Sequence, residues 1–189
     1  MSEFKYEIIA LEGSTEIAYK AHFDGRACEL SEVSGHIAKR RASLQLILAD
    51  IRECHEILNS MRNHEDLSSH LYKAFVITYS KCFASGAVRG LSLDAKRVYK
   101  YAPELLMLHD HVYKMRNTYI AHADNSACEQ AEVYFVKHES LSEVFVPTSK
   151  YSAPWSHSFE ELFSLISELY AHVAEQTRKV DSKITEQFA

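Results

Sequence analysis

Apolar side chains recur every three or four residues along four long stretches of the chain, the spacing that places them on one face of an α-helix. Between Ser31 and Met61 this pattern predicts one long helix, and its stripe comprises Ile37, Leu44, Ile47, Ile51, Cys54, Leu58 and Met61. A second helix is predicted from an N-cap at Asp66 to a stop before Gly86. Its apolar side comprises Tyr72, Val76, Tyr79 and Phe83.

A short helix is predicted at about 94–101, capped by Ser92 or Asp94, and Pro103 suits the first turn of the helix that follows. That helix has the most regular stripe of the chain: Leu105, Leu108, Val112, Met115 and Tyr119. Apolar spacing fails after Ile120, so we expect the helix to end near residue 122. Ser158 with Glu161 forms a capping box for a last long helix. Its apolar side is Phe159, Leu162, Ile166, Leu169, Val173, Val180 and Ile184.

Two further segments are richer in β-branched and aromatic residues. The runs 133–136 and 144–146 flank a short polar connection, which predicts a β-hairpin inserted at about 131–147. Residues 1–30 are ambiguous, because 6–11 suits a strand and 14–23 suits a short helix. We therefore predict the all-α class: an antiparallel bundle of four long helices plus a short one over 31–189, with the inserted hairpin and an N-terminal arm of uncertain structure over 1–30.

Composition narrows the class of protein. The 189 residues fit one domain, and only 5 Gly and 3 Pro leave little of the turn chemistry of an all-β fold. No apolar run approaches the roughly 18 residues of a membrane span, and the polar start lacks a signal-peptide core, so we expect a cytoplasmic protein without membrane contact. The cysteines, Cys28, Cys54, Cys82 and Cys128, form no CxxC pair, and we expect reduced, mostly buried thiols.

The residue types also limit which cofactors the chain is expected to bind. His109 and His111 are two residues apart on a predicted helix, so they point about 200° away from each other and cannot chelate one ion. The other histidines show no mutual spacing that suggests a site, and we expect them at the surface or hydrogen-bonded in the core. The sequence contains no Gly-rich phosphate loop. We therefore predict no metal and no cofactor.

Charge is unevenly placed along the chain. The formal net charge is −5, but the segment from Lys81 to Arg116 has seven basic residues against three acidic ones. Such a segment is expected to bind phosphate groups through Lys81, Lys96, Arg97, Lys100 and Lys114. The alternative is a solvated helix face whose cations pair with neighbouring carboxylates.

One stretch within and beyond this segment, from Lys114 to Asp124, reads KMRNTYIAHAD. Arg116 is followed at once by Asn117, and five residues separate Arg116 from His122 near the predicted end of the most regular helix. This pattern resembles the signature of the HEPN superfamily (higher eukaryotes and prokaryotes nucleotide-binding domains), in which an Arg, a short spacer and a His close a helix. The stretch looks most like the abortive-infection branch. The resemblance covers about residues 31–185 loosely and this stretch closely.

The resemblance implies a metal-independent endoribonuclease of the kind found among toxins and antiphage effectors. His122 would transfer a proton near neutral pH, and Arg116 would supply fixed positive charge to the phosphate. Asn117 would orient the imidazole or the phosphate. Toxin branches of the superfamily often have a Tyr where this chain has Asp124, so Asp124 is a secondary site residue only, as is Tyr79 on the second helix.

Helix geometry separates the two motif residues. Six residues along a helix advance about 9 Å and rotate about 600°, which leaves Arg116 and His122 on different sides of the axis. In the family that this chain resembles, two copies of the motif meet in a dimer. We therefore expect a homodimer, with Leu106, Tyr113 and Ile120 available as a second apolar surface, and we expect RNA and a cognate antitoxin or other partner protein as further partners.

Two other functions remain open. One is a catalytically silent dimer of the same fold that binds a nucleotide, RNA or a partner protein. The other is a purely structural helical scaffold, in which Arg116 pairs with an acidic neighbour such as Asp110 and His122 caps carbonyls at the helix end.

Overall fold

A computed structural model describes residues 3–10, 17–84, 86, 90–117, 129–131, 133–138, 141–150 and 157–188. The chain divides into two compact units, Met1–Gly35 and His36–Ala189. The first is a small sheet, and the second contains the helices and two further pairs of strands. The protein is therefore mostly helical, with small antiparallel sheets.

The N-terminal unit is a three-stranded antiparallel sheet of β1 (Phe4–Ala10), β2 (Ile17–Phe23) and β3 (Arg26–Cys28), in that order. Asp24 and Gly25 join β2 to β3 with positive φ angles of 48° and 76°, the conformation that a tight two-residue hairpin requires. The sequence suggested a strand at 6–11, which β1 largely matches. The short helix suggested at 14–23 is wrong where that segment is described, because residues 17–23 pair with β1 throughout.

One face of this sheet is apolar. Phe4, Tyr6 and Ile8 alternate along β1 and therefore share a face, and their partners on β2 are Phe23, Ala21 and Tyr19. Ala21 is buried at the centre of this face, whereas the five larger side chains are between 48% and 67% exposed. The alternation that makes the segment a strand thus also gathers its aromatic residues on one side.

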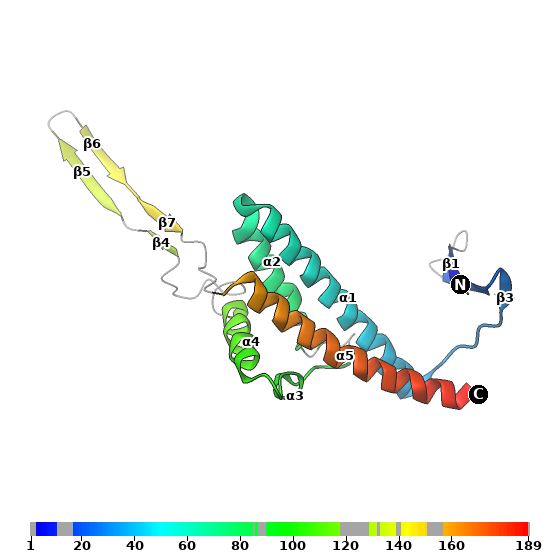
Figure 1. The fold of residues 1–189 in the computed structure, drawn as a ribbon. Helices are drawn as coiled ribbons and strands as arrows, with labels where there is room; N and C mark the ends of the chain where they lie inside the picture. Colours follow the sequence, from blue (N-terminus) through cyan, green and yellow to red (C-terminus); the bar gives the residue numbers. More distant parts are fainter. Residues whose placement is uncertain are drawn as a thin grey trace. The chain divides into compact units, whose positions relative to one another are not determined.

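Five helices build the second unit: α1 (Gly35–Asn63), α2 (Ser68–Lys81), α3 (Ala95–Val98), α4 (Pro103–Met115) and α5 (Phe159–Phe188). Figure 1 shows α1 and α5 running side by side. Arg41 on α1 pairs with Asp181 near the end of α5 at 2.6 Å, while Arg62 lies over the ring of Phe163 near its start. These contacts show that α1 and α5, the two longest helices, run antiparallel.

The short connection between α1 and α2 turns the chain back on itself. The Ser68 hydroxyl at the start of α2 donates to the Met61 carbonyl at 3.4 Å. At the other end of α2 the Thr78 hydroxyl donates to Glu53 at 3.5 Å. The helix α2 is therefore antiparallel to α1 as well.

Local capping explains where most of the helices begin. Asp94 accepts the Lys96 amide at 3.0 Å at the start of α3, and Pro103 opens α4. At α5 the Ser158 amide donates to Glu161 at 2.7 Å, and the Glu161 amide donates to the Ser158 hydroxyl at 3.2 Å, which confirms the capping box.

The predicted cap of α2 is wrong. Asp66 lies inside a 3₁₀ turn, η1 (Glu65–Leu67), and the residue that precedes α2 is Leu67, which makes no side-chain cap bond. Ser92, the other cap considered for α3, instead donates to the Phe83 carbonyl at 2.7 Å.

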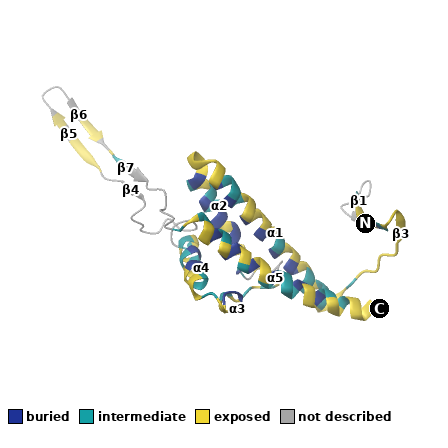
Figure 2. Cartoon of the chain, in the orientation of Figure 1, coloured by how far each residue is buried: buried dark blue, intermediate teal, exposed yellow. Residues whose placement is uncertain are grey.

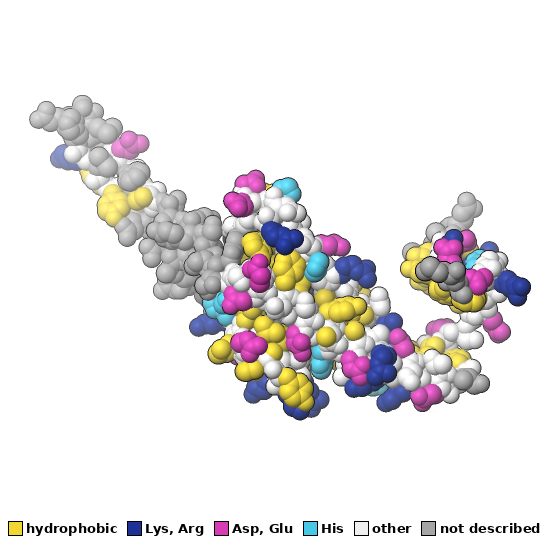
Figure 3. Space-filling model, viewed as in Figure 1, with side chains coloured by type: hydrophobic (Ala, Val, Ile, Leu, Met, Phe, Trp, Pro, Cys, Tyr) yellow, Lys and Arg dark blue, Asp and Glu magenta, His cyan; other side chains and the backbone are white. Residues whose placement is uncertain are grey.

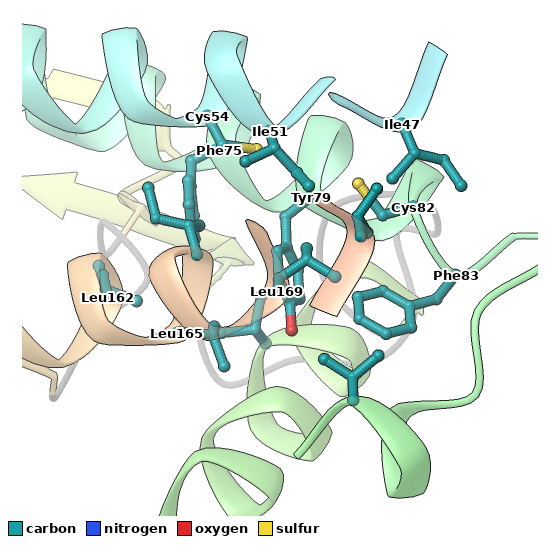
Figure 4. Close-up of a cluster of buried hydrophobic side chains, with 14 of the residues drawn as sticks. Ile47, Ile51, Cys54, Phe75, Tyr79, Cys82, Phe83, Leu162, Leu165 and Leu169 are labelled. Atoms are coloured by element: carbon teal, nitrogen blue, oxygen red, sulfur yellow. The ribbon is translucent and has the colours of Figure 1, made fainter. Parts of the chain in front are cut away.

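The core lies where α1, α2, α4 and α5 face one another. Buried residues follow the inner sides of these helices (Figure 2). Figure 4 shows the centre of this core, where Phe75, Tyr79 and Phe83 from α2 and the turn after it meet Leu165 and Leu169 from α5. Tyr79, Phe83 and Leu169 belong to the apolar stripes that the sequence predicts. Phe75 and Leu165 are buried beside them.

The inserted hairpin is present. β5 (Tyr134–His138) pairs antiparallel with β6 (Leu141–Phe145), and Tyr134 lies opposite Phe145. β4 (Glu129–Ala131) pairs with β7 (Thr148–Lys150), which extends the pairing beyond both ends of the predicted hairpin.

Two expectations from composition can be compared with the structure: buried thiols and the absence of a membrane span. Cys54 and Cys82 are buried free thiols, as expected, and burial raises the pKa of Cys54. Cys28 departs from the expectation because it is exposed, and Cys128 lies outside the described residues. Among the helices that the structure describes, none combines the length and the apolar character needed to cross a bilayer.

Candidate functional site

The first two residues of the predicted motif lie directly after α4. Arg116 keeps helical backbone angles, φ −57° and ψ −45°, and its amide approaches the carbonyls of Val112, Tyr113 and Lys114. Arg116 and Asn117 belong to a wider, π-type turn rather than to the α-helix itself. Single π turns are frequent at functional sites.

The side chains of this pair are held together. Nη1 of Arg116 donates to Oδ1 of Asn117 at 2.8 Å, and the Arg116 side chain is exposed. Among the described residues no carboxylate lies within ion-pair distance of Arg116, so Asp110 is not its partner here. A guanidinium has five N–H donors, and one of them is used in this contact. The Asn117 amide therefore restrains the guanidinium through one of its donors, and the Arg116 side chain is otherwise exposed.

The remaining motif residues, His122 and Asp124, lie outside the described residues, as do Ile120 and the predicted helix end near residue 122. The two apolar residues proposed with Ile120 for a dimer surface, Leu106 and Tyr113, are only partly exposed and pack against the core. On the same helix Met107 is 70% exposed.

The basic residues divide into groups. Lys96 and Arg97 in α3 and Lys100 just after it precede the start of α4, whereas Lys114 and Arg116 lie at its end. A helix from residue 103 to 115 is roughly 18 Å long, so these groups are separated by most of that length. Lys81 ends α2, and all five predicted RNA-binding side chains are exposed. The face in Figure 3 mixes both signs of charge over the helices.

Arg97 and Lys100 each have a local contact. Arg97 lies 3.5 Å from the Asp94 carboxylate, three residues earlier, with both side chains largely exposed. Nζ of Lys100 lies 4.9 Å from the centre of the Tyr101 ring. Exposed contacts of this kind are weak, so both cations can exchange them for a phosphate.

Tyr79, the secondary site residue on α2, lies in the core and not at the surface. It is fully buried, and its hydroxyl lies 2.7 Å from Nδ1 of His109 and 2.9 Å from the Tyr99 hydroxyl. The Tyr99 hydroxyl in turn donates to the Leu165 carbonyl at 3.3 Å. Tyr79 therefore belongs to a buried chain of hydrogen bonds that joins α2 to α4 and α5. Because its side chain is fully buried, it cannot contact RNA.

The two neighbouring histidines of α4 diverge, as the helix geometry predicts. His109 is 6% exposed and lies against Phe83, with ring centroids 4.3 Å apart. His111 points elsewhere and meets His157, just before α5, with ring centroids 4.7 Å apart and planes at 81°. Burial lowers the pKa of His109, and burial followed by the charges of His157 and Lys114 lowers the pKa of His111.

The pairing of His111 with His157 is a feature that sequence reasoning missed. The two residues are far apart in the sequence, and no local pattern links them. Their Nε2 atoms are both buried, and in the described part of the chain neither has a hydrogen-bond partner. Within the described ranges, no group of three or more His, Cys, Asp and Glu residues converges as a metal site would require. A shallow groove lies between other elements, α1 and α5, and is lined in part by Arg52, His55 and Tyr170.

Comparison with protein-family models, with curated proteins and with solved structures finds no match to this chain.

Proposed function

We propose that the chain is a metal-independent endoribonuclease with a HEPN-like helical bundle, and that Arg116, Asn117 and His122 act on the scissile phosphate. The observation that carries this proposal is the Arg116–Asn117 pair: an exposed guanidinium at the end of α4, oriented by an amide at 2.8 Å. In the structural-scaffold alternative a carboxylate would hold this guanidinium, and none of the described carboxylates does.

The chemistry assigns a role to each of these residues. In the proposed reaction the 2′-oxygen of the ribose attacks the adjacent phosphorus and the bond from phosphorus to the 5′-oxygen breaks. The products are a 2′,3′-cyclic phosphate and a 5′-hydroxyl end. Arg116 donates two parallel hydrogen bonds to phosphate oxygens and stabilises the charge of the pentacoordinate phosphorane. Asn117 restricts the guanidinium to one orientation, which lowers the entropy lost when phosphate binds.

Proton transfer needs a base for the 2′-hydroxyl and an acid for the leaving 5′-oxygen. A single His122 cannot hold and lack its proton at once. A homodimer in which two motifs meet would supply two imidazoles, one neutral and one protonated, at a pH near the ordinary histidine value. The dimer would thus account for both proton transfers, and for the separation of Arg116 from His122 that a continuous helix would impose.

The exposed cations provide a path for the RNA. Lys114 adjoins Arg116, and Lys96, Arg97 and Lys100 lie roughly 18 Å away at the other end of α4. An extended RNA strand of a few nucleotides spans that distance. We therefore propose single-stranded RNA as the substrate, contacted at both ends of α4. A cytoplasmic toxin or antiphage effector controlled by a cognate antitoxin is the setting that this activity suggests.

A time course of RNA cleavage in EDTA tests the proposal. Wild-type protein should generate fragments with 2′,3′-cyclic phosphate ends. His122→Ala should slow cleavage by roughly 10² to 10⁴, and Arg116→Ala by roughly 10² to 10³. Asn117→Ala should have a smaller effect, since it removes only the orientation of the guanidinium.

Each variant is compared with wild type by circular dichroism, so that loss of folding is recognised. If folded wild-type protein binds RNA without cleaving it, the chain is the catalytically silent dimer instead. If it neither binds nor cleaves RNA, the proposal is wrong.

A further inference from the structure

His111 and His157 bring two imidazole rings together from separate parts of the chain. His111 lies on α4, and His157 is the residue before the Ser158 capping box of α5. Their ring centroids are 4.7 Å apart and their planes cross at 81°. The pair therefore joins α4 to the residue that precedes the α5 capping box, two places far apart in the sequence.

Both Nε2 atoms are buried, and neither has a hydrogen-bond partner among the residues that the structure describes. Buried polar atoms of folded proteins almost always have a partner, so an orphaned pair at one place points to a ligand, an ion or a water that satisfies both. A neutral imidazole offers its bare ring nitrogen as a lone-pair donor, and this is the atom with which histidine binds metals.

The distance between the two ring centroids is compatible with a shared ion. A metal about 2.1 Å from Nε2, in the plane of the ring, lies roughly 3.2 Å from the ring centroid. Two such rings at a tetrahedral angle have centroids roughly 5 Å apart, close to the 4.7 Å found here. Crossed ring planes are compatible with this arrangement, because each ring needs only to direct its own nitrogen toward the ion.

Lys114 is the charged neighbour of this pair. Its positive charge acts on His111 and therefore repels a cation bound there. The affinity of the pair should therefore be limited, and it should increase when the charge of Lys114 is removed.

We propose that Nε2 of His111 and Nε2 of His157 together bind one late first-row divalent metal ion, such as Zn²⁺ or Ni²⁺, which joins α4 to the start of α5. Imidazole nitrogen is a preferred ligand of these ions. Water completes the coordination, because the protein contributes two ligands. This site does not depend on the proposed ribonuclease activity, which requires no metal.

Thermal unfolding and calorimetric titration of the full chain with ZnCl₂ or NiCl₂ alone, at pH 7.5 in chelator-free buffer, test the proposal. The expected result is saturable binding of one ion per chain and a rise in melting temperature that EDTA reverses. His111→Ala and His157→Ala should each abolish both effects. His172→Ala is the matched control, since this half-buried histidine also has a lowered pKa but lies elsewhere on α5.

Lys114→Gln tests the proposal without removing either of the two coordinating histidines. It keeps both histidines and should tighten metal binding several-fold, whereas damage to the fold would weaken it. The proposal is overturned if 1 mM metal produces no heat and no shift, which would leave water as the occupant. It is also overturned if the His111→Ala/His157→Ala double variant binds as wild type does, since the ions then bind adventitiously to other histidines.

Discussion

Replacing Tyr79 by Phe removes one oxygen from the centre of the buried polar chain. One direction of donation satisfies all three contacts of that chain: Nδ1–H of His109 donates to Tyr79, Tyr79 donates to Tyr99, and Tyr99 donates to the Leu165 carbonyl. Burial raises the pKa of both tyrosine hydroxyls, so both keep their protons at neutral pH. Tyr79→Phe leaves the His109 N–H without an acceptor.

The two tyrosines should therefore differ in their contribution to stability. A buried donor without an acceptor costs about 1–3 kcal/mol, so Tyr79→Phe should lower the free energy of unfolding by that amount. In Tyr99→Phe, His109 can change tautomer and accept from Tyr79. Leu165 keeps the helical position in which its carbonyl accepts a backbone amide. The cost should then be closer to about 0.5–1.5 kcal/mol.

Urea unfolding followed by circular dichroism measures both values, and thermal unfolding should show a fall of roughly 2–4 °C per kcal/mol for a chain of this size. His109→Phe, which removes the donor, should partly relieve the cost of Tyr79→Phe in a double-mutant cycle. The reasoning is refuted if Tyr99→Phe is the more damaging change, or if Tyr79→Phe leaves the midpoint unchanged.

Three further outcomes are expected. Burial lowers the pKa values of His109, His111 and His172 in the folded protein, so the unfolded chain binds more protons at mildly acidic pH. The melting temperature should therefore fall as the pH drops from about 6.5 toward 5, and a flat or rising melting temperature would contradict this. Ser158→Ala should cost about 0.5–2 kcal/mol in urea unfolding through loss of the α5 capping box, and an unchanged midpoint would show that the cap is dispensable. Reversing the charges of Lys96 and Arg97 should weaken RNA binding in filter assays and flatten its salt dependence, and salt-independent binding by wild type would exclude the proposed path.

The parts of the fold set by local sequence were predictable. The Ser158–Glu161 box, the Asp94 cap and the proline that opens α4 act within one turn, and the apolar stripes of α1 and α5 follow from helix periodicity alone. The strand β2 was not predictable in this way. Its segment also suits a helix, and its pairing with β1 decides the outcome.

The candidate site was predictable only where it is continuous in sequence. Arg116 and Asn117 are neighbours, and their contact follows from that. Tyr79 occupies a position of the predicted apolar stripe, and this position determines its burial despite its polar hydroxyl. The meeting of His111 with His157 depends on how α4 packs beside the start of α5, for which a single sequence contains no signal.

If Arg116 stabilises the scissile phosphate, cleavage should depend on it and not on other exposed arginines. The initial rate of cleavage of one single-stranded RNA in EDTA by wild type, Arg116→Ala and Arg178→Ala measures this dependence. Arg178 is the matched control, an exposed arginine on α5 that pairs with Glu175 at 2.9 Å. We predict that Arg116→Ala loses a factor of roughly 10² to 10³ while Arg178→Ala keeps the wild-type rate. Equal rates for the two folded variants, or no cleavage by wild type, would contradict the account.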